Sequence, residues 1–142
     1  MPPDTRSGEC LLVGVPPADL DRVWPDCINY LQRALDSNDD GPTIDEVRAK
    51  IESRECLLWV AYHEQELVMA LVLTTEANRL FMWLMGGINS HLWADDVISA
   101  VKRYALECGM KGVKSVSVPG VARKLKQCGF KKTHELLRFD HE

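Results

Sequence analysis

Apolar side chains recur every three to four residues in three segments of the chain, which is the period of an amphipathic helix. The first segment covers residues 19–35. The second begins at Thr43, a good N-cap because Glu46 three residues later completes a capping box. The third covers residues 89–108, and Gly109 is placed to end it as a C-cap glycine. The pattern therefore predicts three long or medium helices.

Strand-like apolar runs predict a sheet that is covered on both faces. The runs occupy residues 10–15, 56–63, 67–77, 80–87, 113–118 and 131–139. A short basic helix is predicted between the last two runs, ending at Gly129. Since the central strands are apolar on both sides, helices must cover both faces. We expect a single domain over residues 1–142 of the α/β (α+β) class. It is predicted to have one mixed, mostly antiparallel sheet flanked by helices, in the order β-α-α-β-β-β-α-β-α-β.

Composition favours a soluble, cytoplasmic protein. The 142 residues are 46% hydrophobic and 27% charged, which is typical of one compact domain. The five cysteines are odd in number and show no C-x-x-C spacing, so we expect a reducing compartment. The N-terminus lacks the features of a signal peptide, and no apolar run approaches the ~20 residues that span a bilayer. We expect no membrane partner.

Positive charge is concentrated in one part of a chain whose net charge is −4. Residues 102–132 contain nine lysines and arginines, and Glu107 is the only acidic residue among them. Such a segment either forms a solvated face or neutralises an anionic ligand. It lacks regularly interleaved aromatic residues, so the pattern does not favour a nucleic-acid partner.

The element order resembles that of the GNAT N-acetyltransferase superfamily over essentially the whole chain. Two local sequences are similar to family signatures. YALECG places Ala105 and Gly109 in A-x-x-x-G spacing at the end of the third helix, and KLKQCGF at residues 124–130 ends in Gly-Phe before the last strand. A glycine pair followed by a tryptophan early in the helix is also similar to a small group of phage or prophage GNAT-like proteins. The resemblance implies acyl transfer from acetyl-CoA to an amine.

In this family the fourth strand ends at a bulge, and a loop of pattern Q/R-x-x-G-x-G/A binds the pyrophosphate of coenzyme A through backbone N–H groups. The usual family spacing puts this pattern on residues 89–94, where only Ala94 matches and Leu92 replaces a glycine. Gly86 and Gly87 can take over part of this role by adopting positive φ, or they can form a simple tight turn. The candidate coenzyme-binding residues are Met85, Gly86, Gly87, Ile88, Asn89, Ser90, His91, Trp93, Ala94, Arg123, Lys124 and Lys126.

The resemblance also implies a proton-donating tyrosine on the short basic helix, but Leu125 occupies that position. Cys128 is a nearby candidate acid, and Glu76 and His63 at strand ends are candidate general bases. Each has an ordinary interpretation too, as a packed thiol or a solvated strand-end residue. The histidines are scattered without metal-ligand spacing, so we expect no metal site.

Two functional hypotheses remain. The first is an acyl-CoA-dependent N-acyltransferase in which an amine attacks acetyl-CoA directly, after attraction by Asp36, Asp39 and Asp40. The second is a catalytically degenerate GNAT-fold protein with a binding or structural role, for example a phage virion component or an inhibitor of a host protein. The departures from the family pattern favour the second hypothesis, whereas the basic segment favours the first. A protein partner or a homo-oligomer is compatible with both.

Overall fold

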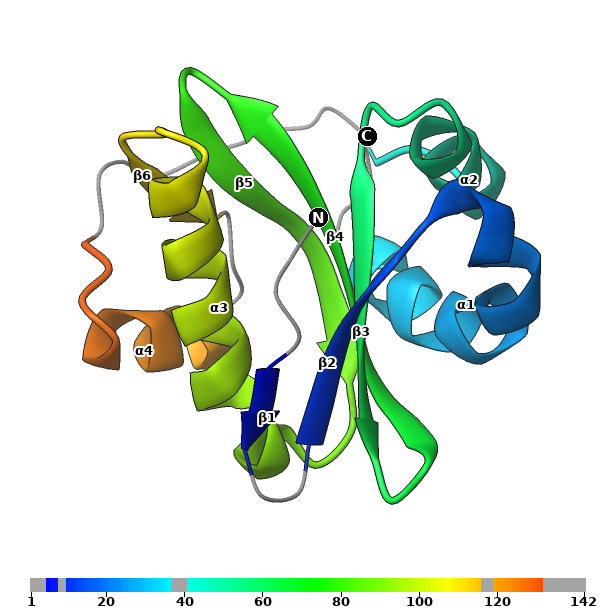
Figure 1. Cartoon of the computed structure of the whole chain (residues 1–142), viewed down its shortest axis with the longest axis horizontal. Coiled ribbons are helices and arrows are strands. Elements are labelled where there is room, and N and C mark those ends of the chain that lie inside the picture. The colour runs from blue at the N-terminus through cyan, green and yellow to red at the C-terminus, as the bar shows by residue number, and fades with distance from the viewer. Residues whose placement is uncertain (1–4, 8–9, 37–40, 116–118, 132–142) are drawn as a thin grey trace, which may run out of the picture.

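The computed structural model describes residues 5–7, 10–36, 41–115 and 119–131, which form a six-stranded sheet with helices on both faces (Figure 1). The strands are β1 (Thr5–Ser7), β2 (Cys10–Val15), β3 (Leu57–His63), β4 (Glu66–Glu76), β5 (Arg79–Gly87) and β6 (Gly112–Ser115). The helices are α1 (Leu20–Asp36), α2 (Ile44–Glu52), α3 (Ala94–Glu107) and α4 (Pro119–Gln127), with 3-10 turns η1 (Pro17–Asp19) and η2 (Ser90–Leu92).

The strands lie in the sheet in chain order. The pairs β1–β2, β2–β3, β3–β4 and β4–β5 are antiparallel. β6 follows the α3 crossover and runs parallel to β5. The predicted mixed, mostly antiparallel sheet is confirmed in the described residues. The apolar pattern does not predict β1, whose three residues are Thr-Arg-Ser. The predicted last strand lies outside the described residues except at Lys131.

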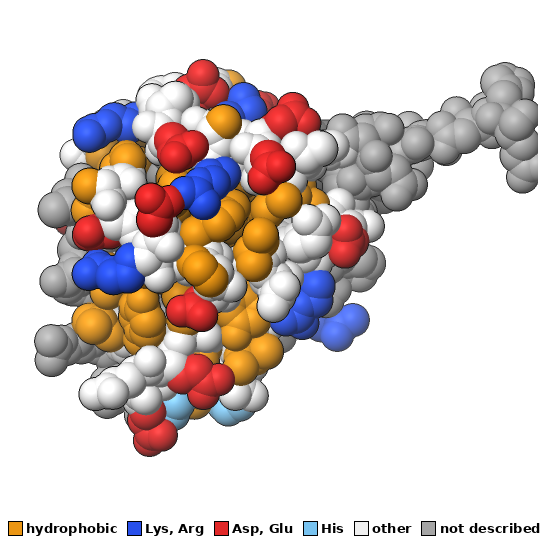
Figure 2. Space-filling model, turned by 90° about the vertical axis from the view of Figure 1, so that its right-hand side faces the viewer, with side chains coloured by type: hydrophobic (Ala, Val, Ile, Leu, Met, Phe, Trp, Pro, Cys, Tyr) orange, Lys and Arg blue, Asp and Glu red, His pale blue; other side chains and the backbone are white. Residues whose placement is uncertain are grey.

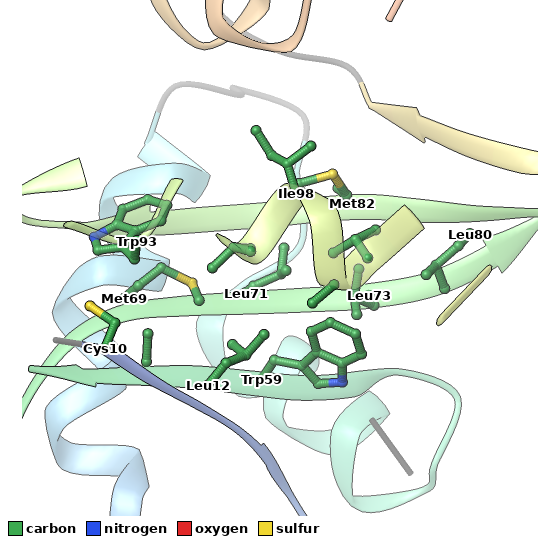
Figure 3. Packing of buried hydrophobic residues seen from close by; sticks show 14 of the residues in the cluster. Cys10, Leu12, Trp59, Met69, Leu71, Leu73, Leu80, Met82, Trp93 and Ile98 are labelled. Carbon is green, nitrogen blue, oxygen red and sulfur yellow. The ribbon is translucent and has the colours of Figure 1, made fainter. Parts of the chain in front are cut away.

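Each face of the sheet has its own hydrophobic core. Successive residues of β3 alternate between the cores, because neighbouring side chains in a strand point to opposite faces. Leu58 and Val60 pack with α1 and α2, while Trp59 and Ala61 pack with α3. Figure 1 shows α1 and α2 on one side of the sheet and α3 and α4 on the other. Figure 3 shows the α3 core, where Trp59, Leu71 and Trp93 are among the packed side chains.

The helix boundaries marked by capping residues agree with the sequence prediction, except at the start of α3. The Thr43–Glu46 capping box is present at α2. Gly109 ends the α3 region at φ +72°, and the backbone of Gly129 has φ +97° after α4. The helix predicted from residue 89 instead begins at Ala94, because Asn89 adopts a left-handed conformation and η2 intervenes.

The buried residues in the described part of the chain are apolar. Cys10, Cys27 and Cys56 are among them, and all five cysteines are thiols. Burial, with a smaller contribution from the charge of Asp26, raises the pKa of Cys27 to about 12. These three thiols therefore behave as small hydrophobic side chains. Among the described helices, none combines the length and the apolar character needed to cross a membrane.

Candidate functional site

A bulge divides β5 into two halves with different neighbours. Against β4, Met82 pairs with Leu73 and Leu84 pairs with Val72, which leaves Trp83 as the extra residue. Trp83 and Leu84 consequently both pack toward the α1/α2 core. The described pairing of β6 with β5 extends to Met82, opposite Ser115, and residues 116–118 of the predicted strand lie outside the described residues. Within the described residues, the second half of β5, residues 83–87, therefore has a strand partner on the β4 side only.

Gly86 and Gly87 allow close packing and are extended strand residues, without the positive φ of a turn. Both belong to β5, and the positive φ values characteristic of a glycine turn occur instead at Gly109 and Gly129 among the described glycines. A Cβ on Gly86 would overlap the backbone carbonyl of Tyr30 in α1. A Cβ on Gly87 would overlap the Val68 carbonyl in β4. The expectation of positive φ at this pair is wrong, because both residues pair with β4 as part of β5. The close approach of α1 and β4 explains why both residues are glycines.

The loop after β5 is closed by its own hydrogen bonds. Ile88 donates its N–H to the Val68 carbonyl at 2.9 Å. The indole Nε1–H of Trp93 donates to the Ile88 carbonyl at 2.8 Å, and the Trp93 side chain is buried. The first N–H groups of any α-helix lack an acceptor within the helix. At α3 the side chain of the N-cap residue, Trp93, does not accept a hydrogen bond from them. A helix start of this kind favours an anion, so it keeps the predicted phosphate site as a candidate.

Three solved structures with this architecture are acetyltransferases. An aminoglycoside acetyltransferase from an uncultured soil metagenomic sample, solved with trehalose, matches with a TM-score of 0.69 and 11% identity over 96% of this chain and 97% of that chain. A predicted acetyltransferase from Clostridium acetobutylicum, solved with acetyl-CoA, matches with a TM-score of 0.65 and 14% identity over 92% and 96%. An aminoglycoside N-acetyltransferase bound to a bisubstrate analogue of coenzyme A matches with a TM-score of 0.66 and 14% identity over 95% and 99%.

The chain has the GNAT fold. This confirms the fold resemblance drawn from the element order. The bulge that the resemblance implies at the end of the fourth strand lies instead inside that strand, at Trp83 of β5. No protein-family model and no curated protein matches the sequence. With identities of 11–16% to solved structures, the comparison shows the GNAT fold and leaves the reaction to be argued from the site.

Two residues of the basic segment 102–132 join α3 to α4 or to the residue just after it. The Lys102 ammonium on α3 donates to the Cys128 carbonyl just after α4. Lys124 on α4 pairs with Asp95 in the first turn of α3 at 2.7 Å, and this hydrogen bond raises the pKa of Lys124. Arg123 and Lys126 are exposed on α4. The basic segment is therefore partly structural, and Arg123 and Lys126 are the residues of the predicted set that face solvent.

Acidic side chains also stand at the start of α3. Asp95 and Asp96 are both in its first turn. Carboxylates at a helix N-terminus interact favourably with the helix dipole, but they oppose the binding of a second anion there. Lys124 offsets one of the two charges through its pair with Asp95.

Two other predicted coenzyme-binding residues differ in exposure. His91, in η2, is exposed, whereas Met85 packs against the α3 core.

The three candidate catalytic side chains lie apart from one another. Glu76 is at the β4–β5 turn, at the opposite end of β5 from Gly87, and pairs with Lys114. His63 ends β3, at the same end of the sheet as Gly87 but across β4 from it. Cys128 follows α4 and is partly buried against the α3 core. The fold does not gather these residues into one catalytic group.

Leu125 occupies a core position. It is 4% exposed and packs among residues of α3 and the sheet. A leucine has no proton to donate, so α4 supplies packing where the family resemblance implies a tyrosine acid. Tyr104 in α3 packs its ring edge-on against Trp59, with centroids 5.4 Å apart, and burial raises the pKa of its hydroxyl. Both side chains thus serve the core.

The position of the bulge, at Trp83, cannot be read from the sequence, although the family resemblance implies a bulge in this strand. The run LFMWLMGG is apolar throughout, so its alternation does not reveal which residue is extra. A bulge is defined by two residues facing one on the partner strand, and only the pairing with β4 shows it.

Proposed function

We propose that the protein transfers an acyl group, acetyl in the simplest case, from a coenzyme A thioester to an amine. The observation that supports this most strongly is the bulge at Trp83, after which residues 83–87 of β5 have no strand partner on the β6 side within the described part of the chain. An extended amide-containing chain, such as the pantetheine arm of coenzyme A, can hydrogen-bond to such an edge as a strand would. Solved neighbours with the same fold contain acetyl-CoA or a coenzyme A analogue.

The described residues suit the pantetheine arm better than the phosphates. The β5 edge offers backbone donors and acceptors, and the open N–H groups at the start of α3 favour an anion. Asp95 and Asp96 weaken that anion site, while Arg123 and Lys126 add positive charge from α4. When bound, a coenzyme A thioester supplies an activated acyl carbon. The chain supplies the β5 edge, which orients the thioester.

Proton transfer in this proposal depends on water. The acyl–nitrogen bond forms as the carbon–sulfur bond breaks, the amine loses one proton and the thiol product gains one. Leu125 cannot give the second proton, and neither His63 nor Glu76 lies beside the β5 edge. The amine must arrive uncharged, so the rate should rise with pH up to the pKa of the amine itself, without a falling limb from a tyrosine acid.

Calorimetric titration with acetyl-CoA, and separately with desulfo-CoA, tests the proposal. We expect micromolar binding that weakens as salt is raised, because phosphate contacts are screened. Hydrogen exchange in the presence of acetyl-CoA should slow at the amides of residues 83–87. Failure of the folded, monodisperse protein to bind either ligand would overturn the acyltransferase proposal.

Paired charge reversals locate the phosphates. Arg123→Glu combined with Lys126→Glu should weaken acetyl-CoA binding about tenfold or more, because each reversal turns an attraction into a repulsion. Arg22→Glu combined with Lys111→Glu is the matched control, since both residues are exposed and lie away from α4. Equal weakening by both pairs would mean that the effect is a nonspecific change in net charge.

A second candidate function is binding without catalysis. The buried Leu125 and the glycine pair used for packing favour it, because both replace features that the family uses for chemistry or for coenzyme binding. In this case the partner is a protein, as for a phage virion component or an inhibitor of a host protein. A protein that binds neither coenzyme analogue but retains a defined macromolecular partner in a pull-down would support this candidate.

A further inference from the structure

The side chain of Trp93 ties together the two ends of the loop between β5 and α3. Trp93 is the N-cap residue of α3, and its indole Nε1–H donates to the Ile88 carbonyl at 2.8 Å. The N–H of Ile88 donates to the Val68 carbonyl of β4 at 2.9 Å. Both backbone polar groups of Ile88 are therefore bonded, one to β4 and the other to the start of α3. These two hydrogen bonds fix the end of β5 relative to the start of α3.

The side chain of Trp93 is placed to hold the loop and not to touch a ligand. It is 6% exposed and packs in the α3 core. A Cβ on Gly87 would lie 3.1 Å from Cζ2 of the Trp93 ring, so the indole covers the end of β5. Figure 3 shows Trp93 at one end of this core, next to Met69 of β4. The one polar atom of the ring is already bonded to Ile88. Trp93 is a predicted coenzyme-binding residue, but its side chain offers a ligand neither surface nor a free polar atom.

The hydrogen bonds of this loop occupy its carbonyls and leave N–H groups unbonded. The carbonyls of Ile88, Asn89 and Ser90 each accept a hydrogen bond from inside the loop or from Trp93. In the part of the chain that the structure describes, the N–H groups of residues 89–91 have no acceptor. Asn89 is left-handed, with φ 53°, and the residues that follow it form a 3-10 turn. Successive N–H groups in such a conformation attract an anion.

We propose that Trp93 is a positioning residue for the phosphates of the coenzyme and that it acts through the Ile88 carbonyl. This inference rests on the proposed function, in which the pantetheine arm lies along the β5 edge. While the indole holds the Ile88 carbonyl inside the loop, the backbone between β5 and α3 presents N–H groups to an anion. Without this hydrogen bond the carbonyl is free to turn outward, and a carbonyl is an acceptor that repels a phosphate. Trp93 therefore sets the affinity for the nucleotide half of the coenzyme without contacting it.

Carboxylates make the α1/α2 side of the molecule a poor surface for these phosphates. Figure 2 views this side and shows carboxylates spread among apolar side chains. The acidic residues expected from the sequence to attract an amine belong to this half of the chain. Asp36 lies at the end of α1 and accepts a hydrogen bond from Gln32 at 2.9 Å, whereas Asp39 and Asp40 are outside the described residues. The start of α3, on the other side of the sheet, is better suited to an anion.

The test compares two tryptophans of the same core. Trp59 is fully buried like Trp93, but its Nε1–H has no acceptor within the described residues. Trp93→Phe removes a bonded N–H, whereas Trp59→Phe makes the same substitution and removes an unbonded one. Each variant and the wild type are titrated with acetyl-CoA and, separately, with S-acetylpantetheine. S-acetylpantetheine keeps the thioester and the pantetheine arm but has no phosphate.

We expect Trp93→Phe to weaken acetyl-CoA binding about tenfold, as for the loss of one hydrogen bond to a partly buried carbonyl, and to leave S-acetylpantetheine binding unchanged. Trp59→Phe should leave both affinities at the wild-type values. Equal weakening of both ligands by Trp93→Phe would show that the residue serves stability alone. Wild-type affinity of this variant for acetyl-CoA would show that the indole hydrogen bond has no part in binding. Either result would overturn the inference.

Hydrogen exchange of the wild type tests the inference without a variant. Acetyl-CoA should slow exchange at the amides of residues 89–91 and 83–87, whereas S-acetylpantetheine should slow it at residues 83–87 alone. If acetyl-CoA protects residues 83–87 but not 89–91, the role of Trp93 fails and the acyltransferase proposal survives. If the wild type binds neither ligand, the proposed function fails and the role of Trp93 fails with it.

Discussion

Leu125 shows how one side chain can serve packing where the fold family has chemistry. It is buried in the α3 core, so Leu125→Ala should lower the free energy of unfolding by about 2–4 kcal/mol through a cavity. Leu125→Tyr should lower the free energy of unfolding by about 1–3 kcal/mol, because a ring larger than leucine overpacks the core. This variant should not transfer acyl groups faster than the wild type. Urea denaturation and a thiol-release assay measure the two effects. Leu106→Ala is the control, since Leu106 is 77% exposed. Faster acyl transfer by the Leu125→Tyr variant would contradict this interpretation of the site.

Cys27 should make the protein sensitive to alkaline pH. Its pKa is about 12 in the folded protein, above the ordinary thiol value of 9.0. Below pH 9 both folded and unfolded chains carry the thiol proton, so the stabilisation is fully present. Between pH 9 and pH 12 only the unfolded chain releases the proton, and this contribution to stability falls by up to about 1.4 kcal/mol per pH unit.

Denaturation curves from pH 8 to pH 11 measure this loss. The Cys27→Ala variant should be less stable at pH 8, because it leaves a small cavity, but its stability should fall less steeply as pH rises. Cys108→Ala changes an exposed thiol and should keep the slope of the wild type. Parallel slopes for the wild type and Cys27→Ala would show that Cys27 does not carry the pH dependence.

At the scale of elements, α1 packs closely against the end of β5. Gly86→Ala would push a methyl group into the Tyr30 carbonyl, and backbone on both sides leaves little room to move. We expect a loss of about 2–4 kcal/mol in the free energy of unfolding. Gly112→Ala is the matched control, because the nearest atom to its added Cβ would be the Arg79 side chain at 3.7 Å. Equal stability of the two variants would contradict the close approach of α1 to β5.

The α3/α4 pair illustrates why a charged segment cannot be assigned from sequence alone. Lys102 and Lys124 fall in the basic segment, yet each contacts the neighbouring helix or the residues that follow it. The same residue type on the same helix, at Lys126, is exposed. The sequence therefore shows how many basic residues the segment contains. Which of them join the helices and which are available to a ligand depends on how α4 lies against α3.

At the scale of the molecule, the two cores share one sheet and should unfold together. Ile51→Val in the α1/α2 core and Ile98→Val in the α3 core should each lower stability by about 0.5–1.5 kcal/mol. Because β3, β4 and β5 contribute side chains to both cores, each change should shift a single transition. Circular dichroism and tryptophan fluorescence should give coincident urea curves for both variants. Two separate transitions in either variant would show that the cores are independent.

The sequence by itself determined most of the elements and the class of the fold. Apolar periodicity and capping residues are local properties, so they located α1, α2, β2 and the β3–β5 meander to within a few residues. The element order was enough to indicate the GNAT fold. The start of α3 was placed too early, because the left-handed backbone of Asn89 depends on the loop as a whole.

The tertiary structure decided what the site residues do. Gly86 and Gly87 suggested a phosphate cradle, but α1 and β4 fill the space beside them. The bulge at Trp83 and the pairing of Lys124 with Asp95 both join residues that are distant in the chain or in different elements. The periodicity of apolar residues indicates which face of a helix or strand a residue occupies. The residues that it contacts in other elements depend on how the helices and strands pack. For this protein, local physics determined the framework, and long-range packing decided which residues surround each candidate site residue.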